Sequence, residues 1–201
     1  MLKVGLTGGL ASGKTFVAGV LEGLGCQVAY ADRMGHEILE PDGEAFADVI
    51  REFGSEIVSA AGSIDRRKLG AAVFADKARL DRLNALVHPH VFRRQEAFFD
   101  AVERDDPKAV AVIEAAIMIE TGSYKRYDKL VLAACPPEVQ IQRYREREGA
   151  TEAQARARLD RQMPLAEKRE YADYVIDTSG TKDYTERQVR KVYAQLKELA
   201  S

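Results

Sequence analysis

Short apolar runs without polar alternation recur along the chain, and longer segments with helical periodicity separate them. The runs lie at residues 3–7, 27–30, 109–113, 129–133 and 174–176. A strand that is apolar on both faces is typical of a parallel sheet covered by helices on both sides. A helical pattern follows each run, as right-handed βαβ crossovers require. The pattern therefore predicts an α/β fold with a doubly wound, parallel, five-stranded sheet.

Two long segments without strand character interrupt this alternation. The first contains helical patterns at residues 44–53, 66–74, 77–87 and 90–103, which is more than one crossover helix needs. We expect Pro89 to lie in the first turn of the last of these helices, because proline favours that position. The second contains helical patterns at residues 137–147 and 151–162, which carry charge on most faces and should project from the core.

These two segments divide the chain by role. We predict a helical substrate-binding insertion at residues 33–107 and a helical lid at residues 136–169. The sheet and its covering helices, the core of the domain, would then comprise residues 1–32, 108–135 and 170–201.

Composition and charge restrict the class of protein. The 201 residues are 46% hydrophobic and 31% charged, as in globular proteins. The net charge of −2 provides no basic field for nucleic acid. Cys26 and Cys135 form neither a disulfide framework nor a zinc motif, which fits a reducing compartment. Because no secretory signal or run of about 18 apolar residues occurs, we expect a cytoplasmic protein without membrane contact.

Residues 8–15 read GGLASGKT and fit the phosphate-binding pattern G-x-x-x-x-G-K-[ST] between a strand and a helix. Glycines allow the backbone to wrap around an anion, and successive N–H groups then point at phosphate oxygens. Lys14 would reach the β- and γ-phosphates, and the Thr15 hydroxyl would ligate Mg²⁺. The motif predicts a nucleotide site.

Acidic residues follow two of the predicted strands. Asp32 comes just after the second strand, at the carboxyl edge of the sheet where open α/β folds bind ligands. It could accept a proton from a substrate hydroxyl or hold Mg²⁺ through water, and it could equally cap the following helix. Glu114 follows the third strand, where an acidic residue commonly assists Mg²⁺.

Arginines are concentrated in the predicted lid, at positions 143, 145, 147, 156, 158 and 161. Arg143 and Arg147 are four residues apart and share one helix face. A closing lid that brings guanidinium groups onto a transferring phosphoryl group would stabilise its charge. Most of the six are expected to form solvated pairs within their helices. For His88 we favour a structural role over the role of a general base.

Further motifs follow one another along the chain: GLTGG at residues 5–9, YAD at 30–32, VHP at 87–89, R-x-x-x-R at 143–147, QMPL-x-x-K at 162–168 and ADYVID at 172–177. In this order they resemble the dephospho-coenzyme A kinase family of P-loop kinases. The resemblance spans nearly the whole chain. Two departures are visible: Tyr30 replaces the first Asp of the family's Asp-Ala-Asp, and residues 114–120 read EAAIMIE where the family has Asp-x-Pro-Leu-Leu before Phe/Tyr-Glu.

The resemblance implies ATP-dependent phosphorylation of the ribose 3′-hydroxyl of dephospho-coenzyme A, the last step of coenzyme A biosynthesis, with Mg²⁺. Matching positions imply the catalytic residues Asp32, Lys14 and Arg143. The implied ATP-binding residues are Gly8, Gly9, Leu10, Ala11, Ser12, Gly13, Lys14, Thr15, Phe16 and Arg147, with Thr15 on the metal. The implied acceptor-binding residues are Thr7, Asp32, His88, Glu120 and Arg143. ATP and dephospho-coenzyme A would be the partners, without nucleic acid, and the oligomeric state is left open.

Three other function classes share the phosphate-binding motif. A kinase for another nucleoside, nucleotide or metabolite would use the same loop and lid arginines. A GTP-binding switch would need Asn/Thr-Lys-x-Asp, whereas residues 181–184 read TKDY. An ATPase subunit of a larger machine would need an appended domain, and we expect none because the predicted sheet, insertion and lid account for nearly all of the 201 residues.

Overall fold

The computed structural model describes residues 1–74 and 76–200. The chain forms two compact units. The first, here called the core unit, comprises Met1–Ala29 and Phe99–Ser201, and the second, the helical unit, comprises Tyr30–Phe98. The functional division into core, insertion and lid stays a prediction.

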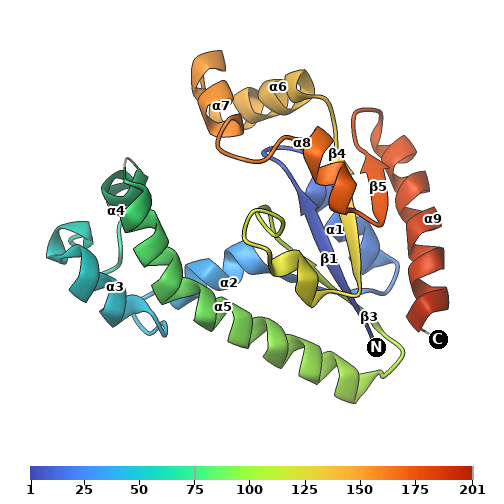
Figure 1. The fold of residues 1–201 in the computed structure, drawn as a ribbon, viewed down its shortest axis with the longest axis horizontal. Helices are drawn as coiled ribbons and strands as arrows, with labels where there is room; N and C mark the ends of the chain where they lie inside the picture. Colours follow the sequence, from blue (N-terminus) through green and yellow to red (C-terminus); the bar gives the residue numbers. More distant parts are fainter. Residues whose placement is uncertain (75, 201) are drawn as a thin grey trace. The chain divides into compact units, whose positions relative to one another are not determined.

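Five parallel strands form one sheet (Figure 1). They are β1 (Leu2–Gly8), β2 (Gln27–Tyr30), β3 (Val110–Glu114), β4 (Lys129–Ala134) and β5 (Tyr174–Asp177), in the order β2-β3-β1-β4-β5. The strand β1 pairs with β3 and β4, with Gly5 opposite Ile113 and Gly8 opposite Ala133. All five predicted strands and the parallel arrangement are confirmed. The carboxyl end of the central strand β1 leads directly into the phosphate-binding motif.

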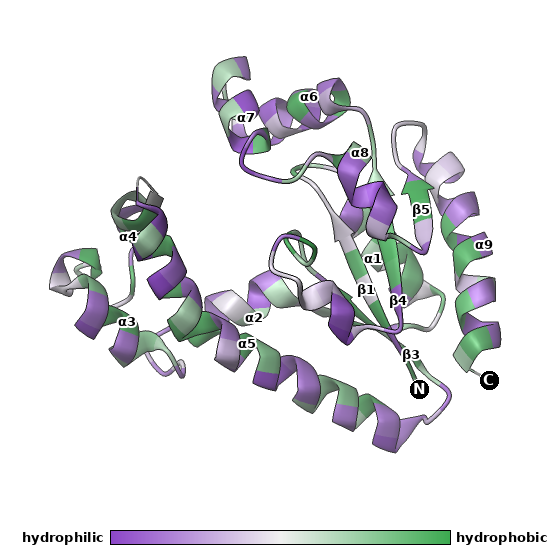
Figure 2. Ribbon diagram, viewed as in Figure 1, coloured by the Kyte–Doolittle hydropathy of each residue, from purple (hydrophilic) through white to green (hydrophobic). Residues whose placement is uncertain are grey.

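Burial explains why these runs lack polar alternation. All five residues of β3 and all but the first of β4 are buried, and Figure 2 shows these strands as predominantly apolar. The helices α1 (Lys14–Gly23) and α9 (Lys182–Ala200) pack against each other, and α9 also contacts β1 and β3. The helix α9 buries Val189, Val192 and Leu196 from one face. A strand with helices against it needs no polar side.

Three more helices of the core unit are α6 (Pro137–Glu148), α7 (Glu152–Leu159) and α8 (Leu165–Lys168). The short 3-10 helices η2 (Ser123–Arg126) and η3 (Arg169–Tyr171) complete its connections. The helices α6 and α7 contact each other and bury few residues, as their charge pattern predicts. The predicted helix over residues 151–162 ends at Leu159, and residues 160–162 form a turn and a bend before Pro164.

The helical unit contains α2 (Ala31–Ile38), α3 (Phe46–Phe53), the 3-10 helix η1 (Ser55–Ile57), α4 (Arg66–Phe74) and most of α5 (Lys77–Asp105). Ile38, Val49 and Phe53 are among its buried residues. On its surface Arg94 donates to both Glu44 oxygens at 2.9 and 2.7 Å, and this hydrogen bonding lowers the pKa of Glu44 to about 2.

One prediction for this unit is wrong. Pro89 lies inside α5, which is a single helix rather than two helices with a start at Pro89. A proline inside a helix removes one backbone hydrogen bond but does not stop the helix where long flanking segments keep theirs. Within residues 1–74 and 76–200, no helix is both long enough and apolar enough to cross a membrane.

Candidate active site

The phosphate-binding loop begins at Gly8, the last residue of β1, and ends where α1 begins at Lys14. Two of its glycines are required by geometry. A Cβ on Gly8 would lie 2.2 Å from the Ser12 Oγ atom, and Gly13 has a φ of 84° with Thr178 against it. The Thr178 hydroxyl donates to the Ser12 carbonyl at 2.6 Å and so fixes the loop from the β5 side. The predicted strand, loop and helix are therefore all present.

A pocket of about 220 Å³ opens on this loop. Its lining consists of Ala11, Ser12, Gly13, Lys14, Thr15, Arg143 and Arg147. Backbone N–H groups at the start of α1, one ammonium group and two guanidinium groups thus surround a single cavity, which is the donor set that binds polyphosphate. The structure brings the predicted loop and the two predicted arginines together.

Glu114, the last residue of β3, contacts the Lys14 and Thr15 side chains of the loop. Its carboxylate lies 3.2 Å from the Lys14 ammonium and accepts a hydrogen bond from the Thr15 hydroxyl at 3.1 Å. Glu114 is only 4% exposed, so this ionised group depends on its partners. A hydroxyl oxygen beside a carboxylate suits Mg²⁺, which takes one or two protein oxygens and completes its shell with phosphates and water.

The two pocket arginines are held differently. Arg143 donates to the Thr178 carbonyl at 2.6 Å and is oriented by the loop after β5, whereas Arg147 contacts the exposed Glu148 at 2.8 Å. Arg156 pairs with Glu152 within α7, as expected for the solvated arginines, whereas Arg145 of α6 lies 3.9 Å from the same Glu152 and so forms a pair between two helices. Only the first arginine is fixed by backbone against the pocket wall. Phe16, which was expected near ATP, has the Lys182 ammonium 5.8 Å from its ring centre.

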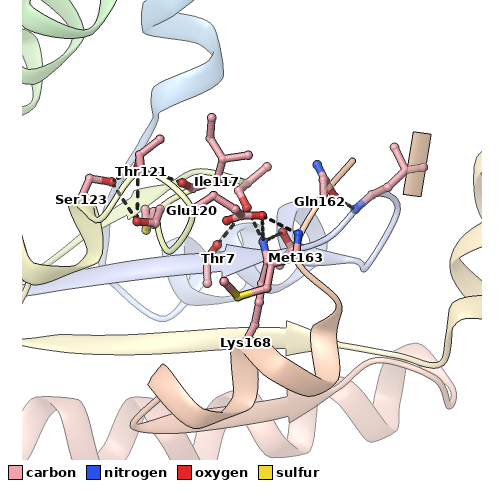
Figure 3. Close-up of polar contacts among 12 residues, drawn as sticks. Thr7, Ile117, Glu120, Thr121, Ser123, Gln162, Met163 and Lys168 are labelled. Atoms are coloured by element: carbon pink, nitrogen blue, oxygen red, sulfur yellow. Dashed lines mark hydrogen bonds and ion pairs between the residues drawn. The ribbon is translucent and has the colours of Figure 1, made fainter. Parts of the chain in front are cut away.

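Of the residues expected to contact the acceptor, Thr7 lies beside the loop that follows β3 and Glu120 lies on that loop (Figure 3). The Thr7 hydroxyl donates to the Ala116 carbonyl at 3.3 Å. The Glu120 carboxylate pairs with the Lys168 ammonium at 2.9 Å and accepts from the Met163 amide at 3.1 Å. Sequence reasoning gave Lys168 no role, although it closes the motif that begins with QMPL. Burial lowers the pKa of Lys168, and the charge of Lys14 lowers it further, while Glu120 opposes both effects.

Two glutamines hold the outer turn of the phosphate loop, and the sequence interpretation gave neither of them a role. The Leu10 amide donates to Gln162 at 2.7 Å, and Gln140 donates to the Leu10 carbonyl at 2.6 Å. A Cβ on Gly9 would lie 2.6 Å from the Gln140 amide nitrogen, so a larger residue there would displace the end of this side chain. Amide side chains occur in every polar helix, and the sequence offers no signal for the role of Gln140.

Asp32 and His88 belong to the helical unit. Asp32 is in the first turn of α2, whose N-cap is Tyr30, so the alternative that Asp32 caps this helix is wrong. His88 is within α5, its ring lies 5.8 Å from that of Phe92, and burial lowers its pKa.

The family model for dephospho-CoA kinase matches residues 2–183. The chain belongs to the dephospho-CoA kinase family. The dephospho-CoA kinase of Thermobifida fusca is 38% identical over 197 residues, which cover 98% of this chain and 96% of the relative. That of Geobacter metallireducens is 40% identical over 189 residues, which cover 94% of each chain. The resemblance seen in the motifs is therefore confirmed.

Solved structures share the fold. A crystal structure of a Thermus thermophilus protein has a TM-score of 0.82 and 31% identity, with 97% of each chain covered. The dephospho-CoA kinase of Campylobacter jejuni has a TM-score of 0.73 and 22% identity, covering 99% of this chain and 98% of its own. The second similarity shows the fold alone. Together with a shikimate kinase from Bacteroides thetaiotaomicron at a TM-score of 0.54, 16% identity and 97% and 98% coverage, it confirms a P-loop kinase fold.

Proposed function

We propose that this protein transfers the γ-phosphoryl group of ATP to the ribose 3′-hydroxyl of dephospho-coenzyme A in the cytoplasm, giving coenzyme A and ADP. The observation that carries the proposal is the pocket in which Lys14, Thr15 and Arg143 converge, in a chain that belongs to the dephospho-CoA kinase family. Phosphoryl transfer needs little covalent chemistry from a protein, since positioning and charge stabilisation supply most of the catalysis.

The donor side is formed by the phosphate loop. Its N–H groups and the start of α1 would bind the phosphates, and Lys14 would move from Glu114 onto the β- and γ-phosphate oxygens. The Thr15 hydroxyl would hold Mg²⁺, with Glu114 as its neighbouring carboxylate. Bound Mg²⁺ neutralises charge on the phosphates. Glu114 thus keeps both groups oriented before nucleotide arrives.

Arg143 would stabilise the charge that develops on the transferring phosphoryl group. Its hydrogen bond to the Thr178 carbonyl fixes the guanidinium group against the pocket before reaction, so little reorganisation is needed. Arg147 pairs with the exposed Glu148 and lies over the ring of Tyr144 on the same helix, and it would turn from these contacts toward the nucleotide. Residues 136–169 would act as the lid that carries both arginines.

Asp32 would act on the acceptor. It comes two residues after the end of β2, at the carboxyl edge of the sheet, where such folds bind ligands. As the 3′-oxygen forms its bond to the γ-phosphorus and the bond to the ADP oxygen breaks, the hydroxyl proton would pass to the Asp32 carboxylate. Thr7, Glu120 and His88 would contact the remainder of dephospho-coenzyme A, and residues 33–107 would form the lobe that binds it.

A coupled assay of ADP release with Mg-ATP tests the proposal. It compares dephospho-coenzyme A with adenosine, AMP, CMP and shikimate, and mass spectrometry with phosphorus NMR locates the new phosphate. We expect turnover with dephospho-coenzyme A alone and a phosphate on the ribose 3′-oxygen. Lys14→Ala is the control for an unrelated contaminating kinase, since it should abolish the signal. Turnover with another acceptor only would keep the kinase chemistry and reject the substrate.

A further inference from the structure

Lys168 is a charged residue whose side chain has no exposed surface. It ends α8, and its ammonium group donates to the Ala116 carbonyl at 2.8 Å and to the Gly8 carbonyl at 3.5 Å, besides its ion pair with Glu120 at 2.9 Å (Figure 3). Three protons thus face three oxygen acceptors. An ammonium group buried this deeply is tolerated only where such partners replace water.

The acceptors belong to two loops of the candidate active site. Gly8 is the first residue of the phosphate loop, whereas Ala116 and Glu120 lie on the loop of residues 115–122, here called the β3 loop. Thr7 donates to the same Ala116 carbonyl. Directly before the β3 loop, Glu114 is held by Lys14. One lysine therefore fixes the residue before this loop, and a second, buried lysine fixes Ala116 near the start of the loop and Glu120 in its second half.

The segment that carries Lys168 also contacts both loops through neighbouring residues. Gln162 accepts from the Leu10 amide of the phosphate loop, and the Met163 amide donates to Glu120 of the β3 loop. Lys168 does not line the phosphate pocket, so it does not act on the phosphates directly. It contacts instead the Gly8 carbonyl of the phosphate loop, which is expected to bind ATP, and the Ala116 carbonyl of the β3 loop, which is expected to lie near the acceptor.

We propose that Lys168 is a positioning residue for phosphoryl transfer, which holds the Gly8 and Ala116 carbonyls so that the phosphate loop and the β3 loop keep one fixed separation. The expected effect on turnover rests on the proposed function, whereas the expected effect on the structure of the two loops does not. Its pair with Glu120 neutralises a buried charge, but the two hydrogen bonds to backbone carbonyls orient the site. These two contributions are separable by mutation.

The experiment measures Lys168→Met in two backgrounds, the natural sequence and Glu120→Gln. Methionine keeps the aliphatic stem and removes the donors, while Glu120→Gln keeps an acceptor oxygen for the Met163 amide and removes the charge. In the natural background, Lys168→Met leaves the Glu120 carboxylate unpaired and should lower the melting temperature. In the Glu120→Gln background, that loss of stability should largely disappear.

The positioning role predicts that the kinetic loss persists in both backgrounds. We expect kcat to fall about 10- to 100-fold, since displacement of a supporting loop by about 1 Å has effects of this size, with the KM for Mg-ATP nearly unchanged. Lys129→Met is the matched control, because Lys129 also forms an ion pair, with Asp173 at 2.9 Å. This pair lies at the amino end of β4, whereas the phosphate loop follows the carboxyl end of β1. A change in kcat below about twofold in the Glu120→Gln background would overturn the proposal.

A second readout does not depend on any activity. In the free protein, Thr121 and Gly122 donate their amides to carbonyls within the β3 loop, and the Ser12 amide donates to Gly9 in the phosphate loop. Lys168→Met in the Glu120→Gln background should accelerate hydrogen exchange at these amides while the melting temperature is retained. Unchanged exchange would reject the positioning role. If the natural protein fails to phosphorylate dephospho-coenzyme A, the proposed function fails, and this exchange result still decides the role of Lys168.

Discussion

The Lys14 ammonium has an acidic partner before any nucleotide binds. Glu114 lies 3.2 Å away, and the same carboxylate holds the Thr15 hydroxyl. ATP phosphates must therefore compete with Glu114 for Lys14, and they offer more negative charge together with the N–H groups of the loop. Asp32 is not among the residues that line the phosphate pocket. The two residues should consequently affect different kinetic parameters.

Asp32→Asn should lower kcat about 10²- to 10⁴-fold with little change in the KM for Mg-ATP, because it removes a proton acceptor and keeps the shape. Lys14→Ala should weaken ATP binding and turnover together, because it removes charge that both the bound ATP and the transition state use. Steady-state kinetics with each substrate varied separates the cases. Asp42→Asn is the matched control, as Asp42 is exposed and belongs to the same helical unit. Near-normal turnover by Asp32→Asn would remove that residue from catalysis.

At the scale of single elements, α7 shows how a short exposed helix is stabilised. It buries only Ala155, so tertiary packing contributes little. Its start carries a complete capping box, in which the Gln154 amide donates to the Thr151 hydroxyl oxygen at 3.2 Å and the Thr151 amide donates to the Gln154 side chain at 2.9 Å. The first turn of this helix thus depends on the reciprocal pair of Thr151 and Gln154.

Thr151→Ala should destabilise α7 locally by about 1 kcal/mol, the usual value of an N-cap, which corresponds to roughly fivefold faster exchange of its amides. Thr151→Ser keeps the hydroxyl and should exchange like the natural protein. Hydrogen exchange followed by mass spectrometry of the peptide over residues 150–160 measures the effect. Equal exchange in both variants would show that packing, rather than the cap, determines the stability of α7.

Elements with a strong local signal were predictable from the sequence, and those determined by distant partners were not. The five strands follow from uninterrupted apolar runs, and the phosphate loop follows from glycines that its geometry requires. The expectation that Pro89 begins a helix was wrong, because proline favours the first turn, whereas the length of α5 outweighs one lost hydrogen bond. Gln140 contacts Leu10, which is 130 positions away, and Lys168 contacts Ala116 and Gly8, which are 52 and 160 positions away; no local pattern encodes such contacts.

At the scale of the whole molecule, the proposed catalytic residues come from both compact units. Lys14 and Arg143 belong to the core unit, which contains the entire lining of the phosphate pocket, while Asp32 belongs to the helical unit. A kinase must also prevent water from taking the place of its acceptor. If the acceptor itself completes the closed site, as the proposed lobe and lid require, then ATP should remain nearly intact until dephospho-coenzyme A binds.

We therefore expect ADP formation from Mg-ATP alone to be at least about 100-fold slower than transfer with a saturating acceptor, because closure that follows acceptor binding excludes water. The measurement compares ADP release with and without dephospho-coenzyme A on one preparation. Asp32→Asn provides the internal control: it should depress transfer and leave the slow hydrolysis unaltered, since Asp32 is proposed to act on the acceptor hydroxyl. Hydrolysis as fast as transfer would contradict acceptor-dependent closure. An equal loss of hydrolysis and transfer in Asp32→Asn would instead assign Asp32 to the metal and phosphates, which is the other role that its position after β2 allows.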